Sequence, residues 1–379
     1  MDLAFSSDEL AFRDEVRAFL DAELTPELAK AGRNCPGIYC DYPAANAWFR
    51  ILASRGWSVP HWPVELGGTR WTPAQHLIFK RELALAGAPP LTPNATHMAA
   101  PVIIEFGTPE QKESLLPRIR SGDDWWAQGY SEPEAGSDLA SLRLAAERDG
   151  NCYVLNGSKT WTTHAHFSNK MFCLVRTDRE AKPQRGISFL LFDLHLPGIQ
   201  IRPIISISGD HELNEVFFDD VRVPVSGLLG KENDGWTVAK HLLRHERSSM
   251  WTPLLRARLE WMKEISGGCP STLAARLMRA EMRLSALEVS ELRLLFAEVD
   301  ERRGSLVSSM SKICGTELRQ ELTEIGLALA DRESLRMPDR PEDTGRGVAL
   351  ATYLNDRAAS IYAGTNEIQR DIVAKILLQ

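Results

Sequence analysis

The sequence predicts a multidomain α+β protein in which a helical region, a β-rich region and a second helical region follow one another. Amphipathic helical patterns with capping residues fill the first third of the chain. Short Val-, Ile- and Phe-rich segments between turn residues fill the middle, and Leu-, Ala-, Arg- and Glu-rich stretches fill the rest. Because 379 residues are too many for one small core, we expect three domains, at residues 1–120, 121–228 and 229–379.

Two capping signals define the N-terminal helical region. Ser6 and Glu9 have the spacing of a capping box, and an apolar helical stripe follows them. Thr108 and Gln111 repeat that spacing around a proline at the first helical position. The helical pattern ends at Ser121-Gly122, so the first domain is expected to end there.

The middle region has the pattern of a β-sandwich or barrel. The dipeptides Asp149-Gly150 and Asn156-Gly157 are typical of hairpin turns and bracket a short apolar segment at residues 152–155. Four further strands are expected at residues 171–176, 186–193, 199–205 and 215–223.

The C-terminal region predicts antiparallel helices of a four-helix bundle from Gly235 onward. A charged break at residues 338–347 interrupts it. The last helix, at residues 366–378, carries an apolar face made of Ile368, Ile372, Val373, Ile376 and Leu377.

Charge and composition exclude several classes of protein. Lys and Arg total 44 against 51 Asp and Glu, a net charge of −7 that argues against nucleic acid as a partner. No run of 18 apolar residues predicts a membrane span, and the acidic start MDLAFSSDELAFRDEV does not have the basic region of an ordinary secretory signal. Six scattered cysteines without C-x-x-C favour reduced thiols and a cytoplasmic location.

Common catalytic signatures are absent from the sequence. It contains no G-x-G-x-x-G after a strand, no P-loop, no H-E-x-x-H and no G-x-S-x-G. The nine histidines do not cluster at ligand spacing, so no metal site is expected.

Three polar segments nevertheless have the composition of binding sites. They read QGYSEPEAGSD at residues 128–138, NGSKTWTT at 156–163 and IYAGTNEIQR at 361–370. Each also has an ordinary interpretation. The first fits an inter-strand loop with exposed acids, the second a strand with one core aromatic, and the third a loop in which Thr365 or Asn366 caps the last helix.

Taken together, in this order and spacing, the three segments resemble the motifs of the acyl-CoA dehydrogenase family. The first resembles its Ser/Thr-Glu-Pro-x-Ala-Gly-Ser-Asp motif, the second its Asn-Gly-x-Lys-x-Trp-(Ile/Thr)-Thr motif, and the third its Tyr-(Glu/Ala/Gly)-Gly-Thr-x-(Glu/Gln)-x-x-Arg ending. The resemblance covers nearly the whole chain and implies FAD as cofactor. It also implies oxidation of an acyl-CoA thioester to the trans-2-enoyl-CoA.

The resemblance also implies roles for individual residues. The main-chain N–H of Ala363 would stabilise the enolate oxygen, because a weakly acidic α-proton is removed only if that oxygen is stabilised. Ser137 would contact the phosphopantetheine end of CoA. The expected flavin contacts are Gln128, Tyr130, Ser131, Trp161, Thr163, Thr365 and Glu367.

The catalytic base is expected at Glu246. Many family members carry the catalytic Glu directly after the Tyr of the last motif, where this chain has Ala363. A minority place the base earlier, in a Glu-Arg pair, and LLRHER at residues 242–247 resembles that pattern. Glu246 is therefore the expected base, with Arg247 near the CoA moiety. The ordinary interpretation of such a pair is a solvated surface ion pair.

The sequence departs from the family in two elements that hold the FAD pyrophosphate and adenine. Residues 256–287 contain no Arg-x-x-Phe-Gly, and residues 321–335 contain no Gly-Gly. A pyrophosphate needs cationic or N–H partners, so we expect a second, homologous subunit to supply them in an α2β2 tetramer. The motif spelling is similar to that of pimeloyl-CoA dehydrogenase large subunits and of the heteromeric members of bacterial steroid degradation. The alternative is a homo-oligomer with divergent FAD contacts.

The resemblance predicts a bulky, branched, cyclic, steroid-derived or dicarboxylic acyl-CoA substrate and an electron-transfer flavoprotein as acceptor. Two other functions stay open. One is a non-catalytic structural subunit of such a complex, and the other is an acyl-CoA oxidase-like flavoenzyme. Fold alone does not decide between these chemistries.

Overall fold

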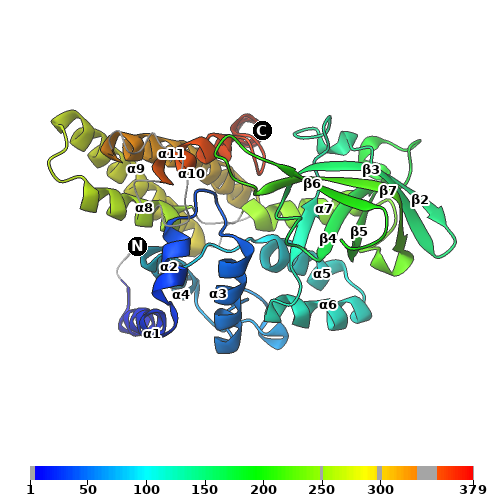
Figure 1. The fold of residues 1–379 in the computed structure, drawn as a ribbon, viewed down its shortest axis with the longest axis horizontal. Helices are drawn as coiled ribbons and strands as arrows, with labels where there is room; N and C mark the ends of the chain where they lie inside the picture. Colours follow the sequence, from blue (N-terminus) through cyan, green and yellow to red (C-terminus); the bar gives the residue numbers. More distant parts are fainter. Residues whose placement is uncertain (1–4, 248–250, 297–300, 331–347, 379) are drawn as a thin grey trace. The chain divides into compact units, whose positions relative to one another are not determined.

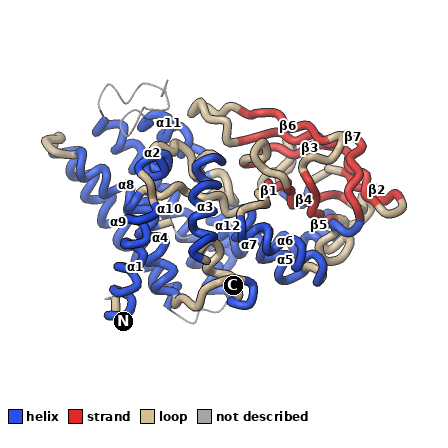
Figure 2. The backbone as a smooth tube through the Cα atoms, turned by 60° about the horizontal axis from the view of Figure 1, so that its bottom comes forward, coloured by secondary structure: helices blue, strands red, loops and turns tan. Residues whose placement is uncertain are grey.

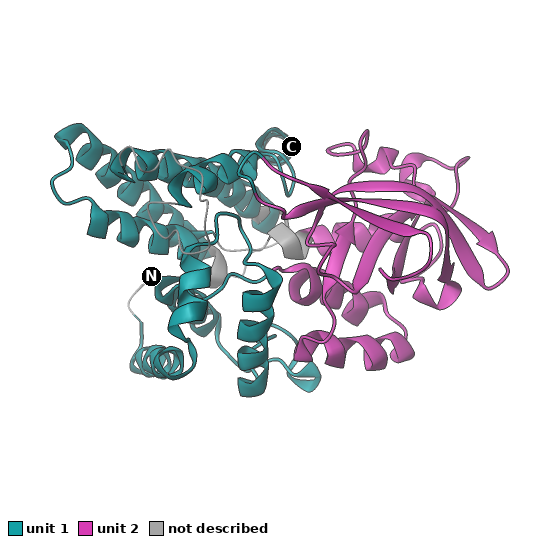
Figure 3. Cartoon of the chain, in the orientation of Figure 1, with its two compact units in different colours: residues 1–91, 207–209, 247–379 teal, residues 92–206, 210–246 magenta. Residues whose placement is uncertain are grey.

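The computed structural model describes residues 5–247, 251–296, 301–330 and 348–378, and it confirms the order of helical, β-rich and helical regions (Figure 1). Contacts divide the chain into two compact units, which are described separately (Figure 3). One unit comprises residues 1–91, 207–209 and 247–379, and the other comprises 92–206 and 210–246. The expected charged break at residues 338–347 lies outside the described residues.

The helices of the first unit are α1 (Ser7–Glu23), α2 (Pro26–Arg33), α3 (Tyr42–Arg55), α4 (Pro73–Ala86), α8 (Thr252–Ile265), α9 (Ser271–Phe296), α10 (Glu301–Ala330), α11 (Ala349–Asn355) and α12 (Asn366–Leu377). Those of the second unit are α5 (Ala100–Phe106), α6 (Pro109–Ser121) and α7 (Gly235–Arg247). The strands are β1 (Trp126–Gly129), β2 (Ala145–Asp149), β3 (Cys152–Thr163), β4 (Lys170–Arg176), β5 (Ile187–Asp193), β6 (Ile199–Ile204) and β7 (Leu213–Pro224). Among the helices within these ranges, none is both long enough and apolar enough to cross a bilayer.

The predicted capping boxes are confirmed at the starts of α1 and α6. At α1 the Glu9 N–H donates to Ser6 Oγ at 3.3 Å, while the Ser6 N–H donates to the Glu9 carboxylate at 2.7 Å. Thr108 and Gln111 form the same reciprocal pair at α6. Gly122 then adopts a φ of +80° as the C-cap of α6, which only glycine adopts without strain. Local chemistry therefore sets these helix ends.

A buried charged triad lies in the C-terminal bundle of α8, α9 and α10. Asp356 is 1% exposed, and its carboxylate lies 2.5 Å from Arg258 Nη1 and 2.6 Å from Arg319 Nε. Arg319 is itself 1% exposed, so two guanidinium groups share one buried carboxylate. The triad joins α8 and α10 to the segment after α11, next to the leucine-rich core of the bundle.

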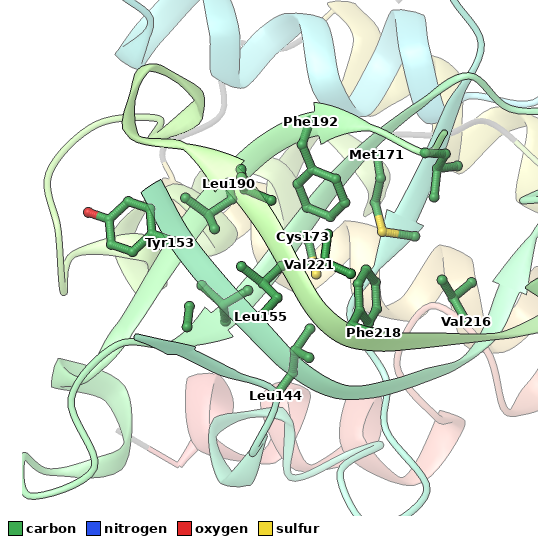
Figure 4. Close-up of a cluster of buried hydrophobic side chains, with 14 of the residues drawn as sticks. Leu144, Tyr153, Leu155, Met171, Cys173, Leu190, Phe192, Val216, Phe218 and Val221 are labelled. Carbon is green, nitrogen blue, oxygen red and sulfur yellow. The ribbon is translucent and has the colours of Figure 1, made fainter. Parts of the chain in front are cut away.

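The second unit is built on a seven-stranded sheet (Figure 2). Its order is β1-β4-β2-β3-β7-β6, and β5 pairs with β4. The buried side chains form one cluster, in which Leu155, Cys173, Leu190 and Phe218 come from four different strands (Figure 4). Helices α5 and α6 lie beside the sheet in both views (Figures 1 and 2). This core supports strand β3, which contains the second polar segment, and the loop after β1, which carries most of the first.

The prediction of a turn at Asn156-Gly157 is wrong. The turn after Asp149 forms as expected, but β3 continues through Gly157 to Thr163 and pairs with β7 over most of its length. Gly157 instead marks a register shift, with a φ of +141° and a Cβ position only 3.0 Å from the Leu144 side chain. Pairing with β7 therefore overrides the local turn preference.

Replacing Asp356 with Ala is expected to lower the free energy of unfolding by about 3–5 kcal/mol, because it leaves Arg258 and Arg319 without their shared carboxylate. Urea unfolding of the full chain measures this loss. The control is Glu317→Ala, whose half-exposed pair with Arg370 is expected to contribute less than about 1 kcal/mol. Equal losses in the two variants would contradict the structural role of the triad.

Candidate active site

The first polar segment leaves β1 and is anchored by Tyr130. This residue is 6% exposed, and its ring lies edge-on to Phe172 and Phe189, with centroids 5.9 and 6.3 Å away. Gln128 and Ser131, on either side, are half-buried. Of these three expected flavin contacts, Tyr130 therefore fixes the path of the chain, while Gln128 and Ser131 keep side chains partly open to a ligand.

A buried ion pair joins the first and second polar segments. Lys159 is fully buried, and its Nζ donates to Glu132 Oε1 at 2.8 Å and to the Tyr130 carbonyl at 3.0 Å. The Glu132 carboxylate also accepts the main-chain N–H groups of Arg143 at 2.6 Å and Leu144 at 2.9 Å. Both charges are thus paired and hydrogen-bonded, the condition under which buried ions are tolerated. The two segments are held side by side by this pair.

The loop that carries Ser137 is fixed at its base by Arg176. The guanidinium donates to the carbonyls of Ala140 at 2.7 Å, Leu142 at 3.0 Å and Pro183 at 2.6 Å. Ser137 itself is exposed. It is thus accessible on a fixed loop, as its expected contact with CoA requires.

A β-bulge exposes Trp161. The register of β3 on β7 shifts between Lys159 and Thr162, and Trp161 lies within the shift with a φ of +59°. A bulky residue rarely adopts this left-handed conformation, which costs about 1–3 kcal/mol. The indole is 59% exposed, so the interpretation of Trp161 as a core aromatic is wrong. The Thr160 N–H donates to the Ser131 carbonyl at 2.9 Å, which ties the bulge to the first segment.

Thr163 ends β3 beside a second strained residue. It is half-buried, and the chain turns at His164, whose φ is +51°. Two non-glycine residues in the left-handed region within four positions are uncommon, and such strain clusters at binding sites. The end of β3 thus offers an exposed aromatic face and a hydroxyl on a rigid strand.

The C-terminal segment is a strained loop held by α10. Ala363 has a φ of +54° and Gly364 a φ of +80°. Lys312 of α10 is 4% exposed, donates to the Ala359 carbonyl at 2.6 Å and lies 5.3 Å from the Tyr362 ring centre. These contacts fix the backbone around Ala363, so its N–H has one direction, as the expected enolate contact requires.

Thr365 and Glu367 have local roles in α12. Thr365 Oγ1 accepts the Ile368 N–H at 3.2 Å and is the N-cap, which confirms the ordinary interpretation of this threonine. The Glu367 side chain is 80% exposed and lies 3.7 Å from Arg370. Flavin contacts from these two residues stay predictions.

Glu246 and Arg247 are the last two residues of α7, and their side chains lie outside what the structure describes. Val238 and Leu242 of this helix are 1% and 0% exposed. Position 246 follows Leu242 by four residues, the spacing that repeats along one helix face. The role of Glu246 as base and that of Arg247 near CoA stay predictions.

Sequence reasoning missed the ion pair of Glu132 and Lys159. The ordinary interpretation of the first segment, an inter-strand loop with exposed acids, fits Glu134 but not Glu132, which is 9% exposed. Lys and Glu are rarely buried unless paired, and no local pattern shows a partner 27 residues away. The one available signal in the sequence is that Glu132 belongs to the first motif and Lys159 to the second.

Family models match the chain in three parts. The acyl-CoA dehydrogenase N-terminal domain matches residues 6–123, the middle domain 127–221 and the C-terminal domain 233–378. The chain is also 37% identical to "Acyl-CoA dehydrogenase IpdE1" of Mycobacterium tuberculosis over 377 residues, 97% of this chain and 96% of that protein. The chain belongs to the acyl-CoA dehydrogenase family. Members of this family are flavin-dependent oxidoreductases that act on acyl-CoA, and this chain is one of them.

Two solved structures resemble this acyl-CoA dehydrogenase over its full length. The "Tcur3481-Tcur3483 steroid ACAD" is 27% identical with a TM-score of 0.88, covering 100% of this chain and 99% of that one. The ChsE4–ChsE5 complex of Mycobacterium tuberculosis is 30% identical with a TM-score of 0.84 and the same coverage. Each is described as a pair of proteins.

The end of β3 in this acyl-CoA dehydrogenase fits a flavin ring. Trp161 holds a flat apolar face open on a rigid strand, and the half-buried hydroxyls of Ser131 and Thr163 belong to the adjoining segments. A planar heterocycle with polar edges needs both kinds of group.

Replacing Lys159 with Met is expected to lower the free energy of unfolding by about 3–5 kcal/mol, because Glu132 becomes a buried charge without its partner. Adding Glu132→Gln is expected to restore part of the loss, since the amide still accepts the Arg143 and Leu144 N–H groups. Urea unfolding compares the single and double variants. The control Arg179→Ala breaks an exposed pair and leaves stability unchanged. A double variant less stable than Lys159→Met would contradict this account.

Proposed function

We propose that the chain dehydrogenates a bulky, steroid-derived acyl-CoA to the trans-2-enoyl-CoA, as the catalytic subunit of an α2β2 complex. The observation that carries the proposal is the exposed, strained Trp161 bulge, in a chain matched along its length by acyl-CoA dehydrogenase domains. Likeness to a structure described as a steroid ACAD supports the substrate class over other branched, cyclic or dicarboxylic thioesters.

FAD, when bound, supplies the acceptor for the hydride that leaves the β-carbon of the thioester. Trp161 would pack beside the flavin ring, and Thr163, Ser131 and Gln128 would hydrogen-bond to its polar edges. The Glu246 carboxylate takes the α-proton, and the N–H of Ala363 stabilises the enolate oxygen as charge develops. The further contacts are Tyr130, Thr365 and Glu367 to the flavin and Ser137 and Arg247 to CoA.

Two observations support Glu246 as the base. The residue after the tyrosine of the last motif is Ala363, which has no proton-accepting side chain. Position 246 lies one helical repeat beyond Leu242, which is fully buried.

The pairing of cations in the C-terminal bundle supports a partner subunit. Arg256 is 8% exposed and donates to the Glu288 carboxylate from Nε at 2.9 Å and from Nη2 at 2.6 Å. Arg276 pairs with Glu324 in the same bundle. Arginines already neutralised by carboxylates are poor partners for a pyrophosphate. A second subunit that brings free cations would complete the FAD site.

Exposed apolar side chains on two helices also favour a partner. Met278 and Met282 of α9 are 66% and 71% exposed, and Val289 on the same helix is 40% exposed. Leu377 at the end of α12 is 65% exposed. Apolar residues at such spacing on one helix face mark an interaction surface. A homologous second subunit has the chemistry to cover them.

An electron-transfer flavoprotein is the proposed electron acceptor. If the reduced complex passes its electrons to an electron-transfer flavoprotein and reacts only slowly with oxygen, the result supports a dehydrogenase. Fast hydrogen peroxide production would favour the oxidase alternative, and a complex without turnover whose flavin lies wholly on other chains would favour a structural subunit.

Replacing Glu246 with Gln is expected to lower kcat at least about 10³-fold, because the amide cannot take the α-proton. The assay uses the complex, a steroid-derived CoA thioester and an artificial electron acceptor. Bound flavin and unfolding free energy are expected to stay unchanged. The control is Glu264→Gln, on an exposed position of α8, with wild-type turnover expected. Near-normal turnover in Glu246→Gln would overturn the assignment.

The ratio of FAD to chain tests the shared site. The chain purified alone is expected to hold little flavin, because Arg256 and Arg276 of its bundle are paired internally. Together with a homologous partner it is expected to form a tetramer with one FAD per two chains, measured by absorbance and light scattering. One FAD per chain in a homotetramer would refute the heteromer.

A further inference from the structure

The side-chain amide of Asn214 joins three groups at the end of β3. Asn214 lies on β7, opposite Thr162, and is 0% exposed. Its Nδ2 donates to the Thr162 carbonyl at 3.0 Å and lies 3.0 Å from His166 Nδ1, while its Oδ1 lies 2.9 Å from His211 Nε2. The Thr162 carbonyl is the first main-chain acceptor after Trp161. Both N–H groups and the oxygen of this amide are therefore directed at the bulge and two imidazoles.

These contacts determine the protonation of both imidazoles. A carbonyl only accepts, so the NH2 group of Asn214 must face Thr162, which fixes the orientation of the amide. The second N–H of that NH2 group points at His166 Nδ1, which must therefore be unprotonated. The amide oxygen faces His211 Nε2, which must carry a proton. The network forms only while His166 is neutral.

The surroundings oppose a charge on His166. Its ring stacks on His211 with centroids 3.9 Å apart and planes 14° apart, so two cations would repel each other at contact distance. Burial and, after it, His211 lower the pKa of His166 to about 4, although the hydrogen bond with Asn214 acts in the opposite direction. Burial also lowers the pKa of His164, which is 2% exposed, to about 4. The carboxyl groups of Asp210 and Glu212 flank His211 in the sequence, and the Glu212 carbonyl accepts the His164 N–H at 2.9 Å.

We propose that Asn214, His166 and His211 form a positioning unit that holds the β3 bulge and presents Trp161 and Thr163 only while His166 is neutral. Protonated His166 would place an N–H against the NH2 group of Asn214. Rotating the amide to accept that proton would remove the donor from the Thr162 carbonyl. The bulge is then free to leave its strained conformation. The control of the bulge by His166 does not depend on the proposed function. Only the statement that the bulge presents Trp161 and Thr163 to a ligand rests on that function.

The direction of the pH effect follows from the lowered pKa. A His166 released from the network returns toward a pKa of 6.5 and binds a proton more readily than the held imidazole. The held bulge is therefore fully favoured above about pH 6.5, and its advantage is lost as the pH falls toward 4. At pH 5 the released population is expected to be about 30-fold larger than at pH 7.5.

Hydrogen–deuterium exchange of peptides covering residues 158–167 tests the unit in the full chain. After correction for intrinsic rates, wild type is expected to exchange about 30-fold faster at pH 5 than at pH 7.5. Asn214→Leu is expected to exchange fast at both pH values. His166→Phe keeps an aromatic ring against His211 and the donor to Thr162, and is expected to exchange slowly at both.

The control is His195→Phe, an exposed histidine in the same unit, which is expected to retain the wild-type pH response. If Asn214→Leu does not fold, the comparison of wild type with His166→Phe still decides. An acid response that persists in His166→Phe, or is absent from wild type, would overturn the proposal.

A second readout separates this inference from the proposed function. In the flavin-loaded complex, the kcat of wild type is expected to fall between pH 6.5 and 5. His166→Phe is expected to remove this fall while leaving turnover at pH 7.5 unchanged. The exchange experiment needs neither flavin nor substrate. If exchange behaves as expected but the complex has no turnover, the proposed function fails and the positioning unit stands.

Discussion

The buried pair of Lys159 and Glu132 is the contact on which the candidate site depends. Neither charge is stable in the core without the other, so the loop after β1 and the middle of β3 form their final positions together. The carboxylate also accepts the main-chain N–H groups of the two residues just before β2, which positions a third segment. This ion pair thus holds two motifs that are distant in the sequence next to each other.

Buried polar side chains also explain how the site retains strained backbone. Trp161 and Ala363 are both in the left-handed region, and neither is a glycine. Each lies next to a buried, fully engaged polar side chain: Asn214 beside the bulge and Lys312 beside the C-terminal loop. Strain of this kind persists only where surrounding contacts over-determine it. Asn214 and Lys312 therefore serve to hold unusual backbone conformations at the two ends of the candidate site.

Sequence reasoning predicted those features that local chemistry decides. The capping boxes at Ser6 and Thr108 and the order of helical and β-rich regions are confirmed, because caps and periodicity act over a few residues. The turn at Asn156-Gly157 failed because pairing with β7 outweighed a dipeptide preference. The burial of Lys159 and the exposure of Trp161 depend on partners far along the chain. The family motifs located the site, but only the fold separates its anchors from its accessible groups.

The distribution of charge gives the proposed division of labour a physical basis. Arg258 and Arg319 share Asp356, and Arg256 pairs with Glu288. These three cations therefore stabilise the bundle and are not free to bind phosphate. A guanidinium cannot serve a buried carboxylate and a pyrophosphate at full strength at once. A chain built in this way can specialise in the ring face and the acyl chemistry only if another subunit brings uncommitted cations. The exposed methionines of α9 are consistent with that requirement, since a subunit interface would bury them.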